Sequence, residues 1–406
     1  MNIGIVTTWF ERGAAYVSRA YAEALRNKGN SVFIFARGGE KTGKGDPKWD
    51  TADVTWGKRY PSTKIDVKEF DRWIKNRCLD VIFFNEQQDW TIVADIKKKY
   101  PKLKLGSYVD YYTESTLDLY DIYDFVICNT MRHMEAMGNH KQKFYLKWGT
   151  DVNVFVPKRQ YKEGKIIFFH SVGMSNRKGT DVLLDAFVQG ELYKTSKLII
   201  HTQVPLESVS NYKKEDVERY GIEVIEKTIS APGLYYMGDV YVYPTRLDGL
   251  GLTMYEALAS GLPVITSDCP PMNEVVDKEV GSLVKIHRLY SRKDGYYWPL
   301  CQCDINDLID KMKYYIDNPK SIPLLSEAAR KKAVEQFDWN KNSKELDRIF
   351  REANIYDLDI KAYRKIKNMQ KNEQRKMLGY FIRNNSYIFR VYSLYKKIKN
   401  SNTIRR

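Results

Sequence analysis

Short runs of apolar and β-branched residues recur through the first third of the chain, and segments of helical or mixed character separate them. We predict strands from these runs at residues 3–6, 32–35, 81–84, 105–109 and 125–128. Because strands that alternate with helices are typical of parallel βαβ units, the pattern predicts a doubly wound sheet in this part of the chain.

A second series of apolar runs follows and predicts another sheet of the same kind. Its strands are expected at residues 166–169, 198–200, 222–225, 240–243 and 263–266. Polar, glycine and proline residues without clear periodicity fill positions 149–165 and suggest an interdomain connection, so we place the boundary near residue 160. Helical patterns then occupy roughly residues 304–317, 321–336 and 341–353. The fold class expected is α/β, with two Rossmann-like domains, 1–160 and 161–336, facing a cleft between them.

Composition agrees with this division and separates a basic tail from it. The chain has 406 residues, 43% of them hydrophobic, which is enough for two cores. Of the formal net charge of +15, residues 357–406 carry +11, and residues 1–356 carry the remaining +4. The basicity therefore bears on partners of the tail more than on the fold.

Cysteine usage and hydropathy indicate a cytoplasmic protein. The five cysteines are an odd number without framework spacing, and no basic n-region followed by a long apolar stretch begins the chain. No uncharged apolar run approaches the ~18 residues of a membrane-spanning helix, so membrane contact is expected to be peripheral. Cys301 and Cys303 have no partner pair at zinc-site spacing, and Asp357 and Asp359 lie in the tail, where they are expected to be solvated.

The segment "RLDGLGLTMYEALASGLPVITSD" (246–268) is the first candidate site. A strand ends before it, glycine-rich residues turn the chain, and a helix is expected from Leu252 to about Ser260. Free N–H groups and the positive end of the helix dipole make such a turn suitable for a phosphate. Asp248 and Glu256 would then flank one ligand rich in hydroxyl groups. The alternative is that Asp248 is only the N-cap and Glu256 an exposed helix residue.

The segment "SVGMSNRKGTDVLLDAF" (171–187) is the second candidate site. It places Arg177, Lys178 and Gly179 after the first strand of the second series and before a helix. Two adjacent cations in such a loop can neutralise a diphosphate, and the alternative is a solvated pair of charges.

These segments together resemble the retaining GT-B glycosyltransferases of family 4. "YPTRLDGLGLTMYEALASGLPVITSD" is similar to the family signature of an acidic residue, seven intervening residues and a glutamate. "RKGTDVLLDAF", "GTDVNVFVP" and "FDWNKNSKELDRIF" resemble further family segments in the same order, and they cover most of residues 1–353. "FDWNKNSKELDRIF" resembles the family's crossover helix, which returns to the first domain. We therefore assign residues 337–356 to the crossover and residues 357–406 to the tail.

The resemblance implies a role for individual residues. Arg177 and Lys178 would hold the diphosphate of a nucleotide-sugar donor, Glu256 the ribose hydroxyls and Asp248 the transferred sugar. Asp110 stands where the family usually has a histidine, and it either faces the sugar or acceptor or caps a loop. Further positions in or near the donor pocket would be Gly13, Gly173, Leu250, Gly251, Leu252, Thr253 and Glu274.

The activity implied is transfer of a hexose-type sugar, with retention of configuration, from a nucleotide-diphosphate sugar such as a UDP or GDP donor. The acceptor would be a saccharide or a lipid-linked saccharide in bacterial envelope polysaccharide synthesis, such as O-antigen or capsule. Positive side chains and a helix N-terminus take the place of a metal in such a site, so neither a divalent metal nor another cofactor is expected. The alternative hypothesis is a catalytically inactive, membrane-attached scaffold that binds sugar nucleotides.

The tail suggests where the protein resides. Ile388, Val391, Tyr395 and Ile398 follow a helical spacing among lysine and arginine residues. Such a basic amphipathic helix either binds an anionic membrane surface, here the inner face of the cell membrane, or packs its apolar side on the protein. Nucleic acid is not expected as a partner because no recognised nucleic-acid module accompanies the charge, and the sequence leaves the oligomeric state open.

Overall fold

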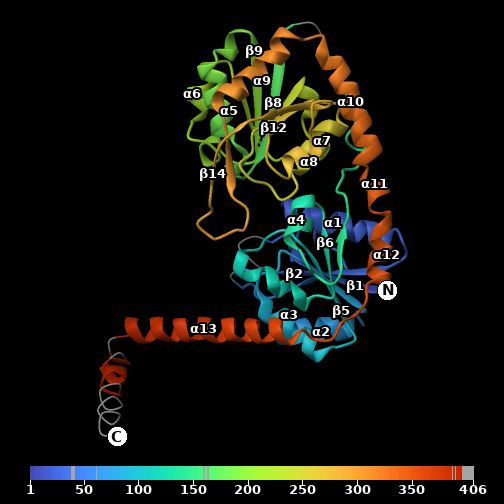
Figure 1. The fold of residues 1–406 in the computed structure, drawn as a ribbon, viewed down its shortest axis with the longest axis vertical. Helices are drawn as coiled ribbons and strands as arrows, with labels where there is room; N and C mark the ends of the chain where they lie inside the picture. The colour runs from blue at the N-terminus through green and yellow to red at the C-terminus, as the bar shows by residue number, and fades with distance from the viewer. Residues whose placement is uncertain are drawn as a thin grey trace.

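Two parallel sheets organise the chain into two domains. The computed structural model describes residues 1–37, 42–60, 62–158, 161, 164–385, 387–388 and 390–395. Each sheet packs with helices, and the two domains lie one above the other along the long axis of the molecule (Figure 1). The expected pair of Rossmann-like domains is therefore confirmed. The expected boundary at residue 160 lies outside the described residues and stays a prediction.

The first sheet has the strand order β3-β2-β1-β4-β5-β6-β7, and every neighbouring pair is parallel. Its strands are β1 (Asn2–Thr8), β2 (Ser31–Arg37), β3 (Val54–Trp56), β4 (Val81–Asn85), β5 (Lys104–Tyr108), β6 (Phe125–Cys128) and β7 (Lys143–Tyr145). All five predicted strands are present. The edge strands β3 and β7 were not predicted, since each has only three residues and none of these is buried.

Three helices of the first domain begin where a short polar side chain caps a free N–H group. Asp66, Asp89 and Thr130 accept hydrogen bonds from the first turns of these three helices. The helical segments are α1 (Gly13–Arg26), α2 (Val67–Asn76), α3 (Trp90–Lys99), η1 (Glu114–Ile122, a 3₁₀ helix) and α4 (Met131–Ala136).

The second sheet repeats the topology with the strand order β10-β9-β8-β11-β12-β13. Its strands are β8 (Ile166–Gly173), β9 (Ser196–Thr202), β10 (Glu223–Glu226), β11 (Val240–Tyr243), β12 (Val264–Ser267) and β13 (Gly281–Val284). The α-helices around it are α5 (Thr180–Gln189), α6 (Lys214–Glu218), α7 (Leu252–Ala259), α8 (Met272–Val275) and α9 (Ile305–Asp317). Short 3₁₀ turns are η2 (Asn176–Lys178), η3 (Leu192–Lys194), η4 (Leu206–Ser208) and η5 (Tyr235–Met237).

Both sheets reverse their strand order beside their first strand, between β1 and β4 and between β8 and β11. Ligands of open parallel sheets bind at the carboxyl ends of the strands at such switch points. The loops that follow these strands line a cleft between the domains.

The C-terminal helices carry the chain back to the first domain along one side of the molecule (Figure 1). They are α10 (Ser321–Gln336), α11 (Trp339–Asn342) and α12 (Lys344–Glu352). The helix expected at 341–353 is thus divided at Ser343 into α11 and α12. Phe350 is fully buried and packs against Phe83 and Phe125 of the first sheet.

An antiparallel hairpin projects from the second domain between β13 and α9. Its strands are β14 (Ile286–Tyr290) and β15 (Leu300–Cys303). The loop between them extends toward the first domain on the side of the molecule opposite to α10–α12 (Figure 1).

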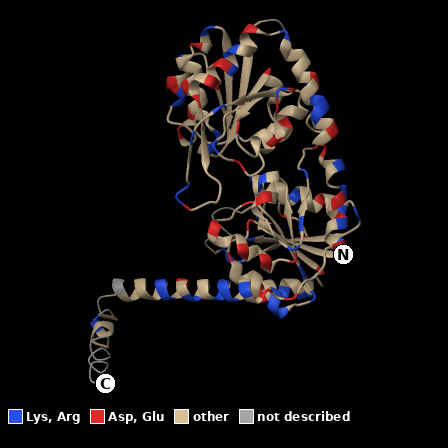
Figure 2. Cartoon of the chain, in the orientation of Figure 1, with Lys and Arg blue, Asp and Glu red and all other residues tan. Residues whose placement is uncertain are grey.

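The tail is a long helix, α13 (Ile360–Asn384), whose first turns dock on the first domain. Ala362 and Ile366 are buried there, against the region of α3 and η1. The rest of α13 extends away from the body and carries lysine and arginine residues along its length (Figures 1 and 2). Ile388, Val391 and Tyr395 follow it, and Ile398 lies outside the described residues.

In the described part of the chain, no helix combines the length and the apolar character that crossing a membrane requires.

Candidate functional site

The cleft between the domains has a volume of about 1440 Å³ and collects nearly all the predicted site residues. Of the twelve, Asp110, Gly13, Gly173, Arg177, Lys178, Asp248, Leu250, Leu252, Thr253 and Glu256 line it. Gly251 lies between two lining residues, and Glu274 does not line the cleft. The local patterns after β8 and β11 therefore predicted residues that the fold brings together.

The turn before α7 has the geometry that the glycines suggested. Gly251 is the N-cap of α7 in the left-handed conformation, with φ of 72°, which glycine adopts without steric cost. A Cβ atom on Gly251 would also come within 2.4 Å of Met254 Cε. The alternative that Asp248 is only the N-cap is wrong, because Gly251 takes that position. Leu252 and Thr253, in the first turn of α7, line the cleft, so the N-terminus of this helix lies at the cleft wall.

Lys178 and Asp248 form an ion pair inside the cleft. The ammonium group donates to the Asp248 carboxylate and, at 2.5 Å, to the Tyr243 hydroxyl, which itself donates to Asp248. Burial alone would raise the pKa of Asp248, but the charge and hydrogen bond of Lys178 outweigh it and lower the pKa. Asp248 is therefore a carboxylate that holds Lys178 at the cleft wall.

Arg177 lies beside this pair with its charge available. Its side chain is exposed and lines the cleft, and among the ion pairs of the described residues none involves Arg177. Gly179, two residues after Arg177, has φ of 75°, and a Cβ atom there would meet the Pro244 carbonyl oxygen at 2.0 Å. Only glycine permits this close approach of the two loops, which puts Arg177 next to the turn before α7.

Glu256 faces the cleft from α7 and is half-buried, so the alternative of an exposed helix residue is wrong. Its Oε2 accepts a hydrogen bond of 2.5 Å from the Tyr235 hydroxyl. Burial raises the pKa of Glu256, and the Tyr235 hydrogen bond opposes this increase.

Asp110 reaches the same place from the first domain. A Cβ atom on Gly249 would lie 2.4 Å from Asp110 Oδ1, so the carboxyl group rests against the backbone of the turn before α7. Burial raises the pKa of Asp110 to about 7, and the neighbouring Glu86 adds to this increase while Arg132 opposes it. The Gly249 N–H donates to Asp248 Oδ1 at 3.0 Å, so carboxyl groups of both domains, those of Asp110 and Asp248, lie beside Gly249.

The glycines expected on the cleft walls occupy them. A Cβ atom on Gly13 would lie 3.9 Å from Leu252 Cδ1 across the cleft, and one on Gly173 would lie 3.7 Å from Gln203 Oε1. Gly173 also has φ of 66°, a backbone conformation suited to glycine.

Glu274 has a different place from the one expected. Its carboxylate accepts hydrogen bonds from the backbone N–H groups of Met131, at 2.7 Å, and Arg132, at 3.1 Å. It thus caps the N-terminus of α4 from the opposite domain, where the helix dipole favours a negative charge. The sequence of the second domain alone does not reveal this partner.

Several residues in or beside the cleft were not predicted from the sequence. Glu86 follows β4 directly, has φ of 53° and pairs with Arg12 at 3.6 Å. Glu86 follows β4 and Asp110 follows the neighbouring strand β5, so both lie at the carboxyl ends of the strands. This position could have identified Glu86 as a candidate site residue. Arg132, which does not line the cleft itself, donates to the carbonyl oxygens of Asp248 and Pro270 beside it. The hairpin also contributes lining residues, namely Arg292, Asp294 and Tyr296.

Among the described residues, no group of three or more His, Cys, Asp or Glu side chains is arranged to hold a metal ion. Asp359 caps α13 by accepting a hydrogen bond from Ala362 N–H. His170, which is fully buried, bonds to the Val242 carbonyl and the Thr180 hydroxyl, and burial lowers its pKa to about 4.

Part of the chain is similar to known glycosyltransferases. Residues 163–292 match the family model of the glycosyl transferases group 1. The MMP α-(1→4)-mannosyltransferase of Mycolicibacterium hassiacum is 23% identical over 212 residues, which are 50% of this chain and 47% of that protein. The chain spans about half the length, or less, of the curated relatives that it matches.

Solved structures agree on the fold of nearly the whole chain. Sucrose-phosphate synthase from Thermosynechococcus elongatus superposes with a TM-score of 0.68 at 18% identity, covering 86% of this chain and 98% of that one. HepE from Anabaena, in complex with UDP and glucose, gives a TM-score of 0.67 at 14% identity, covering 87% and 100%. The expected GT-B fold is confirmed.

Proposed function

We propose that the chain transfers a hexose-type sugar from a nucleotide-diphosphate sugar to a saccharide or lipid-linked acceptor, because residues 163–292 match the group 1 glycosyltransferase family model and the fold is GT-B. One observation carries the proposal. Two cations, a helix N-terminus and carboxyl groups of both domains meet in one cleft, at Arg177, Lys178, α7, Asp248 and Asp110.

The second domain holds the donor in this proposal. Arg177, Lys178 and the N-terminus of α7 neutralise the diphosphate, which gains negative charge as the bond to the sugar breaks. Glu256 accepts hydrogen bonds from the ribose hydroxyls, because its carboxylate has more acceptor sites than Tyr235 uses. The first donor to test is a UDP-sugar, since HepE binds UDP and glucose.

Catalysis then depends on the charge around the sugar. Asp110 and Asp248 stabilise the positive charge that develops at the anomeric carbon, and the cations stabilise the leaving group. The departing phosphate takes the proton of the acceptor hydroxyl, and the sugar is transferred with retention of configuration. No metal ion is required, because the protein supplies the positive charge.

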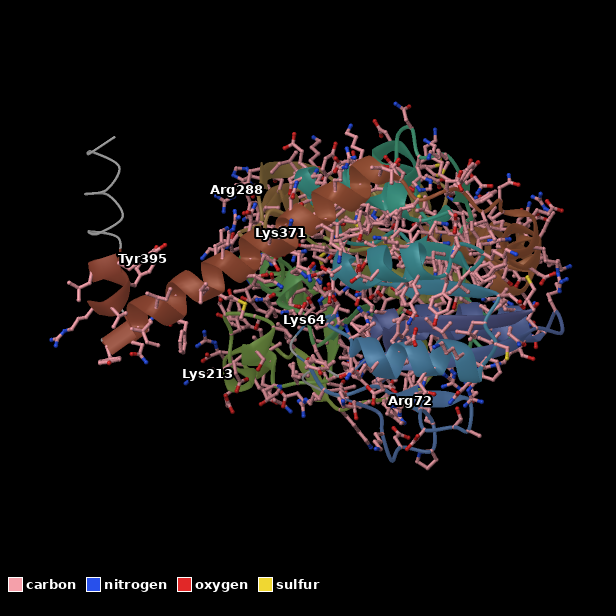
Figure 3. The ribbon with its side chains drawn as sticks, turned by 90° about the horizontal axis from the view of Figure 1, so that it is seen from below. Lys64, Arg72, Lys213, Arg288, Lys371 and Tyr395 are labelled. Atoms are coloured by element: carbon pink, nitrogen blue, oxygen red, sulfur yellow. The ribbon has the colours of Figure 1, made fainter. Side chains whose placement is uncertain are left out.

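The first prediction concerns nucleotide binding. UDP at ~100 times its dissociation constant should raise the free energy of unfolding by about 2.7 kcal/mol, which shifts the melting temperature by several degrees. We expect this shift in a panel of nucleoside diphosphates with EDTA present, measured by differential scanning fluorimetry. Arg177→Gln should reduce the shift, while Arg72→Gln, on α2 outside the cleft, should not (Figure 3).

A folded protein that responds to no nucleoside diphosphate would contradict this function. A folded protein that binds a nucleotide and turns over none of its sugars would favour the inactive scaffold instead. A shift that appears only with a divalent metal would contradict the metal-independent mechanism.

The tail supports a further part of the proposal, namely attachment to the inner face of the cell membrane, where envelope polysaccharides are assembled. Beyond its docked turns, α13 exposes Met377, Leu378, Tyr380 and Phe381, which are 57–70% exposed. Lys371, Arg375 and Lys376 are exposed on the same stretch, and Tyr395 lies at the far end (Figure 3). Apolar and cationic side chains together suit an anionic lipid surface.

The second prediction tests this attachment in the full chain. The variant K371Q/R375Q/K376Q should bind phosphatidylglycerol vesicles on the order of a hundredfold more weakly than the unmodified protein, at ~1 kcal/mol for each cation removed. The control K313Q/K320Q/K331Q removes three exposed lysines on or beside α9 and α10 and should bind nearly as well. Equal binding of all three proteins in vesicle sedimentation would rule out the tail as the anchor.

A further inference from the structure

The β14–β15 hairpin connects the domains on the side of the cleft opposite to the crossover helices (Figure 1). Its tip, residues 294–298, lies along residues 110–113 of the first domain. Residues 110–113 begin two positions after the last residue of β5, and we name them the Asp110 loop. More than 180 residues of sequence separate the two segments, so this contact belongs to the folded chain alone.

Hydrogen bonds tie each part of the Asp110 loop to the hairpin. The Tyr296 hydroxyl donates to the Asp110 carbonyl at 3.1 Å. The Tyr297 N–H donates to the Tyr112 carbonyl at 2.9 Å, and Trp298 Nε1 donates to the Tyr112 hydroxyl at 2.5 Å. An antiparallel bridge joins Thr113 to Tyr296. Backbone and side chains therefore fix the register of the two segments.

Aromatic packing reinforces these bonds. The rings of Tyr111 and Tyr296 stack with centroids 5.3 Å apart and planes at 18°. Tyr112 is fully buried, and Tyr296 is 8% exposed. The Arg132 guanidinium lies 5.6 Å from the ring of Trp298, and it also donates to the Asp248 carbonyl. Stacked aromatic pairs and cations over rings are favourable contacts that exclude water.

The base of the hairpin is attached to the turn before α7. Cys301 N–H donates to the Arg246 carbonyl at 2.9 Å, and Leu300 and Tyr296 pack against Leu247. The hairpin therefore contacts both the Asp110 loop of one domain and the segment around Asp248 of the other. These are the two segments whose carboxyl groups both lie beside Gly249.

We propose that the hairpin is an interdomain clamp and that Tyr296 is the positioning residue that sets the Asp110 carboxyl group beside the sugar of the donor. The inference rests on the proposed function for its reaction and deepens it by naming what aligns the two domains on the sugar. In this proposal the second domain binds the nucleotide. The hairpin fixes the position of the first domain, and so of Asp110, relative to the bound sugar.

The third prediction is kinetic and removes one hydroxyl group. Tyr296→Phe keeps the ring stack and loses the bond to the Asp110 carbonyl, so we expect a roughly tenfold fall in kcat, as for one lost positioning hydrogen bond. The KM for the donor should stay within about twofold, because the nucleotide contacts are unchanged. Tyr314→Phe, on α9 outside the cleft, is the matched control and should behave as the unmodified protein.

The pH profile distinguishes positioning from general stability. Glu86, Arg132 and Asp248 face the Asp110 carboxyl group, and burial with Glu86 raises its pKa to about 7. The ascending limb of kcat/KM, which reports ionisations of the free enzyme, should therefore lie near pH 7 in the unmodified protein. In Tyr296→Phe the loosened loop admits water, the pKa of Asp110 falls toward that of an ordinary carboxyl group, and the limb should move to lower pH. An unchanged kcat and pH profile would overturn the proposal.

Hydrogen exchange tests the clamp without any substrate. Peptides that contain the Tyr297 amide should exchange slowly in the unmodified protein and faster in Trp298→Phe, which loses the bond to Tyr112. Rapid exchange of this amide in the unmodified protein would overturn the clamp whatever the activity. If the amide is protected but no donor is turned over, the proposed function fails and the docking of the hairpin stands.

Discussion

Replacing Glu256 by glutamine is expected to lower kcat/KM by about a hundredfold or more, the largest loss of activity that we predict. Glutamine keeps the shape of the side chain and one oxygen for the Tyr235 hydroxyl. It loses the charge and the acceptor sites that bind the two ribose hydroxyls, and hydrogen bonds to a charged group are worth about 1.5–3 kcal/mol each. Steady-state kinetics with the donor identified by the melting panel measures this loss.

Glu256→Gln should remain folded, which makes the result interpretable. The pKa of Glu256 is raised in the folded protein by burial, so stability is lost as the pH rises through the ordinary pKa range of glutamate toward the raised value. A neutral side chain removes that cost at neutral pH, and the variant should melt no lower than the unmodified protein. The matched control is Glu327→Gln, at an exposed position of α10 outside the cleft. Full activity of Glu256→Gln would eliminate the ribose assignment.

Replacing Asp124 by asparagine is expected to produce the largest loss of stability, about 3–5 kcal/mol. Asp124 is fully buried, and Lys97, its ion-pair partner, is 3% exposed. The same carboxylate accepts hydrogen bonds from Leu105 N–H, at 2.7 Å, and Tyr356 N–H, at 2.8 Å. Asparagine would leave the lysine charge buried without compensation, and removing one partner of a buried pair has this cost.

Urea denaturation followed by circular dichroism measures how much Asp124→Asn lowers the free energy of unfolding. Asp118→Asn breaks an ion pair with Lys365 whose side chains are 46% and 37% exposed, so it should cost less than ~1 kcal/mol. Similar midpoints for the two variants would mean that the Lys97 pair does not stabilise the first domain. A large effect would explain how the segment at Tyr356, which precedes α13, is held to the first domain.

The two sheets could be predicted from the sequence because their central strands are continuous apolar runs. The helix after the glycine turn was predicted for a similar reason, since Gly251 and Gly261 mark its ends to within a residue or two. The residues that reach the cleft from this helix and from the loop after β8 were found because each group is local in sequence. Their roles toward a donor remain predictions.

The remainder of the site depends on contacts between distant segments. Glu274 was assigned to the donor pocket, yet it caps α4, a helix more than 130 residues earlier. Tyr296 and the Asp110 loop meet through hydrogen bonds that no local periodicity encodes. The position of Glu86 directly after β4 is only a weak sign of a site residue. Glu86 lies near Asp110 because β4 and β5 are neighbours in the sheet.

The two crossings between the domains determine how they can rotate. Thr150 and Asp338 form a parallel bridge, and a Cβ atom on Gly149 would lie 2.2 Å from the Phe337 carbonyl oxygen. The two chain segments thus behave mechanically as one short ribbon and define one bending axis. Because the hairpin lies on the far side of the cleft from this axis (Figure 1), opening about the axis moves the hairpin farther than it moves the cleft walls near the axis. A small opening angle at the ribbon separates the hairpin contacts first, before the walls near the axis part.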